Sequence, residues 1–118
     1  MVDLNDASSQ EIYRVPTGKS FIPLFVVARN PSGDLSGGAG IVSLFFGFDG
    51  GVSDWNAPQS MSTTDFTQTS HFKVFPQEFG SGFSVSVIGA AGDRFRVKVD
   101  STFGSAATLI FDVFGYLF

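Results

Sequence analysis

The last eleven residues, 108–118, read Thr-Leu-Ile-Phe-Asp-Val-Phe-Gly-Tyr-Leu-Phe, and they are apolar at both odd and even positions. Successive side chains of a β-strand point to opposite faces, so such a strand needs a covering surface on each side. We expect Leu109, Phe111 and Val113 to pack into the core of the domain. The even-numbered positions predict an interface with another sheet or subunit. They carry Ile110, Phe114, Tyr116 and Phe118.

Glycine and proline are spread along the whole chain and break every stretch that could sustain three helical turns; the 118 residues include 14 Gly and 5 Pro. The pattern therefore predicts an all-β chain of one domain. The expected strands are 11–15, 20–29, 40–48, 63–68, 70–75, 82–88, 94–99 and 107–117. Eight strands in this length favour a two-sheet antiparallel β-sandwich of jelly-roll type over residues 11–118, preceded by a flexible arm at residues 1–10.

Two further stretches, 21–27 and 41–48, are also apolar at both odd and even positions. We expect strands of this kind to lie centrally in a sheet, or beside the terminal strand at an interface. We therefore expect Phe46 and Phe48 to be neighbours of the terminal strand at the interface between subunits.

Composition limits the classes of partner. Hydrophobic residues make up 43% of a small domain, which indicates that a partner covers some apolar surface. The net charge is −4, and the one basic cluster is Arg94, Arg96 and Lys98, which argues against nucleic acid. No apolar stretch reaches the ~20 residues of a membrane-spanning helix, and the first residues lack the features of a signal peptide. Together with the initial Met1 and the absence of cysteine, this favours a complete small gene product that folds in a reducing cytosol.

Candidate catalytic and metal-binding residues are few. His71 is the single histidine, and no nucleophile motif accompanies it, so we expect a surface residue and no enzyme activity. Asp49 and Asp54 lie on a Gly-rich loop and offer oxygen ligands to Ca²⁺, but the twelfth position, Ser60, lacks the Glu of an EF-hand loop. We favour a solvated turn and predict neither a metal site nor a cofactor.

Trp55 is the single tryptophan, and it defines the best candidate ligand patch. Its indole would stack on a pyranose ring, while its polar neighbours would bond sugar hydroxyls. These neighbours are Asp54, Asn56 and Gln59. The alternative, which we favour, is that Trp55 anchors its loop against the end of the sandwich or a neighbouring subunit.

Two segments in the C-terminal part resemble the last two strands of tumour-necrosis-factor and complement C1q-like trimeric jelly rolls. They are residues 92–99, Gly-Asp-Arg-Phe-Arg-Val-Lys-Val, and residues 109–118, which contain Phe-Gly-Tyr-Leu near their end. The resemblance implies a three-fold assembly with the terminal strand near the axis. The cytokine and complement functions do not carry over, because the first two-thirds of the chain lacks the other signatures of those families.

Features along the whole chain resemble small β-sandwich domains of tailed-bacteriophage virion proteins, which occur in capsid decoration proteins and fibre tips. These features are the Pro16-Thr-Gly-Lys turn before a long apolar strand, the Asp54-Trp loop, the Gly92-Asp hairpin and the terminal Asp112-Val-Phe-Gly-Tyr-Leu strand.

This second resemblance implies a non-enzymatic, homotrimeric decoration or cement subunit of the virion that is assembled in the host cytoplasm and binds the major capsid protein. Val2 and Leu4, in the arm, are the expected capsid contacts. The alternative is a carbohydrate- or receptor-binding module of a phage fibre or bacterial surface protein that uses the patch around Trp55.

Overall fold

The computed structural model describes residues 1–38, 40–48, 55, 59–76, 88–100, 103–104 and 106–118. Within these ranges the chain forms eight strands and one short 3-10 helix, and no helix there is long and apolar enough to cross a membrane. The elements are β1 (Val2–Asp3), β2 (Ser9–Arg14), β3 (Phe21–Arg29), β4 (Ile41–Gly47), β5 (Gln59–Ser62), η1 (Thr63–Asp65), β6 (Phe72–Pro76), β7 (Arg94–Val99) and β8 (Thr108–Leu117).

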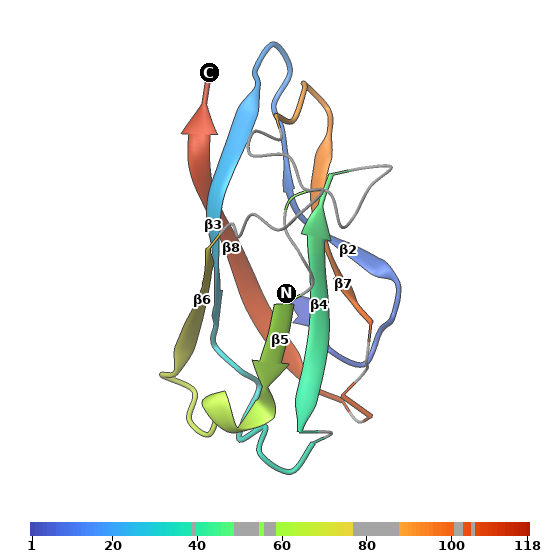
Figure 1. Cartoon of the computed structure of the whole chain (residues 1–118), viewed down its shortest axis with the longest axis vertical. Coiled ribbons are helices and arrows are strands. Elements are labelled where there is room, and N and C mark those ends of the chain that lie inside the picture. The colour runs from blue at the N-terminus through green and yellow to red at the C-terminus, as the bar shows by residue number, and fades with distance from the viewer. Residues whose placement is uncertain (39, 49–54, 56–58, 77–87, 101–102, 105) are drawn as a thin grey trace.

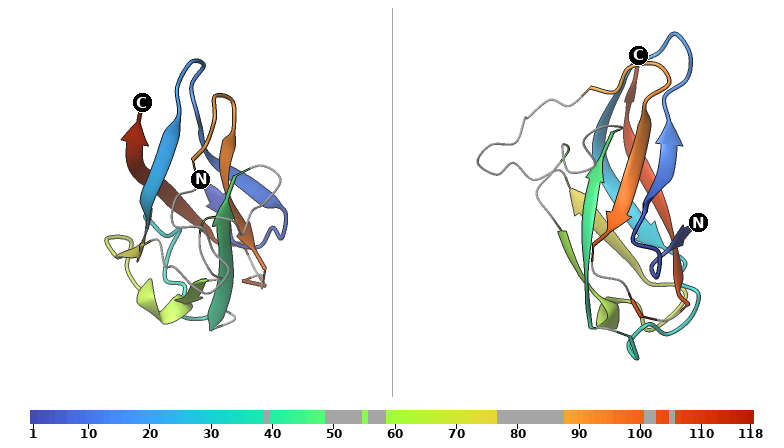
Figure 2. Two further views of the ribbon diagram at one scale, coloured as in Figure 1. Left: turned by 45° about the horizontal axis from the view of Figure 1, so that its top comes forward. Right: turned by 90° about the vertical axis from the view of Figure 1, so that its right-hand side faces the viewer.

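The strands form two four-stranded antiparallel sheets, in the orders β1-β8-β3-β6 and β2-β7-β4-β5, and the sheets face each other as two layers (Figures 1 and 2). The pairing runs from the ends of the chain inward. β1 pairs with β8, β2 with β7, β3 with β6 and β4 with β5. The ladders β3–β8 and β4–β7 then complete the two sheets. This is the strand order of a jelly roll, so the predicted all-β sandwich is confirmed.

Most strand predictions fall within a few residues of the observed strands, but that for 63–68 is wrong. Thr63–Asp65 form η1, and the strand of this region comes earlier, at Gln59–Ser62. Ser62 causes the change, because its Oγ accepts a hydrogen bond from the backbone N–H of Thr64 at 3.3 Å and so caps the helix. The strand predicted at 82–88 lies outside the described residues except for Ile88.

The core between the sheets is centred on an aromatic cluster. Phe46 of β4 lies 5.6 Å from Phe75 of β6, 6.0 Å from Phe111 of β8 and 6.4 Å from Phe95 of β7, measured between ring centroids. All four rings are buried, and they come from both sheets. The cluster therefore joins the two layers by apolar burial and ring contacts.

The expectation of a flexible arm at residues 1–10 is wrong. Val2 pairs with Leu109, and beyond this bridge the N–H of Leu4 donates to the carbonyl of Ala107 at 2.9 Å. Val2 and Leu4 are 3% and 0% exposed and belong to the core, so they are not available as capsid contacts. Figure 2 shows the N-terminus beside the strands.

A side-chain clasp holds this segment against the next strand. The amide of Gln10 accepts from the N–H of Asp3 at 2.9 Å and donates to the carbonyl of Asp3 at 2.8 Å. The sequence did not predict this packing, because Val2 and Leu4 stand among polar residues. Two alternating apolar side chains are too few to identify a strand.

We expect Leu4→Ala to lower the free energy of unfolding by about 2–5 kcal/mol, because the substitution leaves a cavity at a fully buried position. Urea unfolding would measure the change. Met1→Ala is the matched control, since Met1 is 88% exposed, and it should leave stability within about 0.5 kcal/mol of the wild-type value. A Leu4→Ala chain as stable as this control would restore the interpretation of residues 1–10 as an arm.

Candidate interaction surface

The register of the first sheet places a set of apolar side chains on its outer face, away from the second sheet. Val27 of β3 pairs with Val74 of β6 on one side and with Asp112 of β8 on the other. Side chains of paired residues share a face, so the outward positions follow from the alternation along each strand. We call this surface the outer β8-β3-β6 face. It comprises Ile22, Phe25, Val27 and Arg29 of β3, Phe72, Val74 and Pro76 of β6, Ile110, Asp112, Phe114 and Tyr116 of β8, and the adjoining Phe118.

The centre of the outer β8-β3-β6 face is a stacked aromatic pair. Phe25 and Phe114 are directly opposite each other on β3 and β8, and their rings lie 4.9 Å apart at an angle of 14°. Phe114 remains 47% exposed, because nothing in the described part of the chain covers its outer side. This pair is typical of the aromatic anchors found in protein interfaces.

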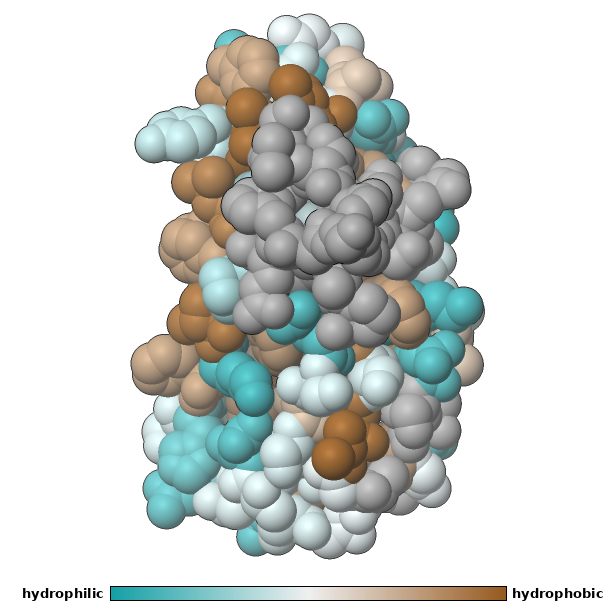
Figure 3. Space-filling view, viewed as in Figure 1, coloured by the Kyte–Doolittle hydropathy of each residue, from teal (hydrophilic) through white to brown (hydrophobic). Residues whose placement is uncertain are grey.

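Exposed apolar residues are concentrated on this sheet. Of the ten large apolar side chains that are exposed in the described part of the chain, seven lie on β3, β6 or β8 or directly after β8. These seven are Leu24, Phe72, Val74, Phe114, Tyr116, Leu117 and Phe118. In Figure 3 brown and tan residues follow the upper and middle parts of the left margin, where β8, β3 and β6 lie. A contiguous apolar surface of this kind marks an interaction site.

The outer face of the second sheet is more polar. The strand β7 presents Arg94, Arg96 and Lys98 outward, and Ser43 of β4 pairs with Ser60 of β5. Ser43 separates the two outward apolar residues of β4, Ile41 and Phe45. Such alternation of polar outer and apolar inner side chains is the pattern of a sheet with one solvated face. The two sheets are therefore not equivalent, and the apolar one is the candidate interface.

One ion pair interrupts the apolar surface. The Nε of Arg29 donates a hydrogen bond to Oδ2 of Asp112 between β3 and β8, and the two side chains are 42% and 37% exposed. This hydrogen bond, followed by the attraction of the same carboxylate, raises the pKa of the Arg29 guanidinium. Arg29 therefore keeps its positive charge, and the ion pair adds no formal net charge to the face.

The predicted interface residues on the terminal strand are on this face. Ile110 is half-buried, whereas Phe114, Tyr116 and Phe118 are exposed, and the inward positions Leu109 and Phe111 are buried as expected. The stretch 21–27 was expected to lie centrally or beside the terminal strand, and β3 is a central strand that lies between β6 and β8 and pairs with β8 along most of its length.

The assignment of Phe46 and Phe48 to the interface is wrong. They are 0% and 4% exposed and lie between the two sheets. Their positions on β4 and just after it share the inward parity of Val42 and Leu44, and β4 belongs to the second sheet, which does not contain β8. Their bulk therefore stabilises the core and not a contact between subunits.

Trp55 is also placed differently from the proposed ligand patch. It is 0% exposed, its indole packs edge-on against Phe46 and Phe95, and its Nε1 donates to the carbonyl of Pro23 at 3.1 Å. A buried indole cannot stack on a sugar ring, so the structure supports the anchoring role. Gln59 is half-buried at the start of β5. Asp54 and Asn56 lie outside the described residues.

The other candidate residues of the sequence are His71 and the acidic residues considered as metal ligands. Nδ1 of His71 accepts from the N–H of Thr67 at 3.3 Å, which fixes a turn. Among the residues that the structure describes, no three of His, Asp and Glu are grouped so as to hold a metal ion. The candidate Ca²⁺ ligands Asp49 and Asp54 fall outside these residues.

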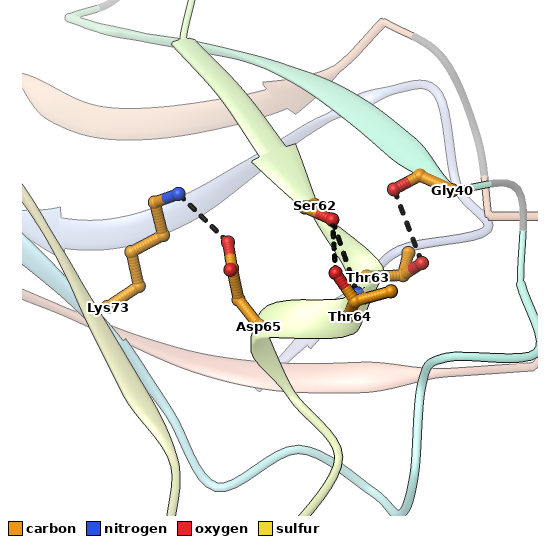
Figure 4. Close-up of polar contacts among 6 residues, drawn as sticks. All are labelled: Gly40, Ser62, Thr63, Thr64, Asp65 and Lys73. Atoms are coloured by element: carbon orange, nitrogen blue, oxygen red, sulfur yellow. Dashed lines mark hydrogen bonds and ion pairs between the residues drawn. The ribbon is translucent and has the colours of Figure 1, made fainter.

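A polar corner at one end of the sandwich is structural (Figure 4). The buried Thr63 donates from Oγ1 to the carbonyl of Gly40 at 3.3 Å, and Ser62 and Thr64 share a hydroxyl contact of 2.7 Å. Lys73 and Asp65 form an ion pair at 2.9 Å beside it. These bonds attach η1 to Gly40, directly before β4, and to β6. The hydroxyl groups of Ser62, Thr63 and Thr64 therefore have structural partners, and we assign them no ligand-binding role.

Sequence reasoning missed the contribution of β6 and of the ion pair. Phe72 and Val74 are 66% and 46% exposed on the outer face, next to β3. A signal was present, because the stretch 72–76 is apolar at four of its five positions and, like β8, needs cover on both sides. The pairing of Arg29 with Asp112 depends on the register between β3 and β8. These strands are distant in sequence, and no local sequence pattern reveals their register.

Comparison with protein-family models, with curated proteins and with solved structures finds no match to this chain.

Proposed function

We propose that this chain is a non-enzymatic structural subunit of a virion, a homotrimeric decoration or cement protein that binds the capsid of a tailed phage. The observation that carries the proposal is the outer β8-β3-β6 face, which combines exposed aromatic residues with a single ion pair and no formal net charge. The jelly-roll strand order and the resemblance of the terminal strand to trimeric jelly rolls support three copies around an axis.

The mechanism is multivalent clamping. Copies joined through the outer β8-β3-β6 face leave the polar face of the second sheet and the ends of the sandwich available to the capsid. Each copy then adds a modest contact, and linkage raises the effective concentration of the other two. Because Val2 and Leu4 are buried in the core, the capsid contact belongs to these exposed surfaces and not to the N-terminal residues.

The carbohydrate-binding alternative loses its central residue, since Trp55 is buried. We therefore assign no sugar site to the described residues.

Light scattering after size exclusion, over a range of protein concentrations, tests the assembly. We expect three times the chain mass of 12.6 kDa. A monomer at every concentration would overturn the proposal, and a dimer would overturn its three-fold part. The proposed role in the virion is tested separately: we expect the oligomer to cosediment with capsids of the phage that encodes it.

A further inference from the structure

The Arg29–Asp112 ion pair is unusual in its surroundings. Arg29 lies beside Phe72 on one side and Ile110 on the other, and Asp112 lies beside Val27. The pair is therefore diagonal across β3 and β8, at the end of the face where β3 ends, and its registered neighbours are apolar. Each side chain keeps more than a third of its surface exposed, so water still reaches both charges in the single chain.

Covering the outer β8-β3-β6 face would remove this water. A guanidinium has five N–H donors, and the described hydrogen bond uses Nε. The Nη groups of Arg29 and the second oxygen of Asp112 then need partners in the covering surface, because a buried charge without hydrogen bonds is costly. An entirely apolar cover would not supply them.

A second copy of the same chain does supply them. The face carries one positive group on β3 and one negative group on β8, with apolar residues around both. The β3 side of one copy is thus electrostatically complementary to the β8 side of another, and complementary charges of this kind fix orientation and partner choice. No foreign surface is required to explain the two charges.

We propose that in the homo-oligomer Arg29 of each copy pairs with Asp112 of the next copy, so that the charges alternate in a closed ring around the axis. This inference rests on the proposed assembly and specifies its register. A shift by one residue along a strand would place a charge against apolar side chains, so the ring would select one arrangement among several that bury similar apolar area.

The test uses two charge-reversed chains, Arg29→Asp and Asp112→Arg. The first presents two carboxylates on the face and the second presents two guanidiniums, so we expect each alone to run as a monomer by light scattering. Two kinds of chain cannot alternate in a ring of three, so the rescue uses a single chain that carries both changes, Arg29→Asp and Asp112→Arg. This chain exchanges the two charges and restores an unlike pair at every contact, so we expect it to run at the wild-type mass. Its oligomer should dissociate as salt is raised from about 0.1 to 1 M, which shortens the Debye length from about 10 to 3 Å.

Lys73→Asp is the matched control. It reverses one charge of an ion pair of similar exposure, Lys73–Asp65, which lies away from the outer β8-β3-β6 face. We expect this chain to keep the wild-type mass. Circular dichroism of all four variants checks that they fold, and the half-exposed positions of Arg29 and Asp112 favour this.

The outcomes separate the inference from the proposed function. An oligomeric wild type whose two single variants keep its mass would overturn the ring and leave the assembly intact. So would single variants that are monomeric together with a doubly changed chain that is also monomeric. A monomeric wild type would overturn both. Single variants that lose assembly, together with a doubly changed chain that regains it, would support the ring.

Discussion

We expect the Phe114→Asp chain to be a monomer at every concentration at which the wild-type chain is a trimer. Phe114 is the half-exposed member of the stack with Phe25 at the centre of the outer β8-β3-β6 face. A carboxylate at this position would be buried between copies without a partner, at a cost of several kcal/mol. In the single chain the same carboxylate points toward water, so the sandwich should still fold, apart from the loss of about 0.5–1.5 kcal/mol of ring contact.

Light scattering gives the mass, and thermal unfolding followed by circular dichroism reports the fold. Ile41→Asp is the control. Ile41 is 59% exposed on the second sheet, so it offers a comparable change outside the proposed interface. Trimers of Phe114→Asp with wild-type mass would show that this face is not where the copies meet, and loss of assembly in both variants would point to a general effect of added negative charge.

We expect Trp55→Ala to lower the free energy of unfolding by about 3–5 kcal/mol. The indole is fully buried between Phe46 and Phe95, and its hydrogen bond to the carbonyl of Pro23 links its loop to β3 of the other sheet. Small domains have only about 5–15 kcal/mol of total stability, so a large part would be lost. Chemical denaturation measures the change.

Trp55→Phe separates ring packing from the hydrogen bond. It keeps an aromatic ring in the cluster and leaves the carbonyl of Pro23 without its donor, so an intermediate loss of about 1–3 kcal/mol is expected. Two results together would contradict the anchoring role: wild-type stability of the Trp55→Ala chain, and loss of a glycan-array signal that the wild-type chain gives. They would favour the carbohydrate-binding alternative.

Features that depend on the alternation of side chains within one strand could be predicted from the sequence. Features that depend on contacts between segments distant in sequence could not. The inward and outward residues of β8 follow from alternation alone. For β4, apolar residues at both parities could not tell which face meets the other sheet, so Phe46 was assigned outward although it lies at the centre of the core.

Trp55 and the first residues show the same limit. The polar neighbours of Trp55 left a sugar site open beside the favoured anchoring role, and the residue that its indole anchors to, Pro23, is 32 residues away. Val2 and Leu4 gain their burial from Leu109 and Ala107, at the opposite end of the chain. Neither partner can be inferred from a pattern within one segment.

The pairing of the first strand with the last has a consequence for biosynthesis. β8 is a central strand that joins β1 to β3, so the first sheet has no continuous framework until residues 108–117 have left the ribosome. Until then β3 has β6 along one edge but lacks β8 along the other. Contacts between residues so far apart in sequence form slowly, and incomplete chains expose surface that aggregates. The strand that completes the fold also carries much of the candidate interface, so a nascent chain acquires its surface for association only when it can close its own core.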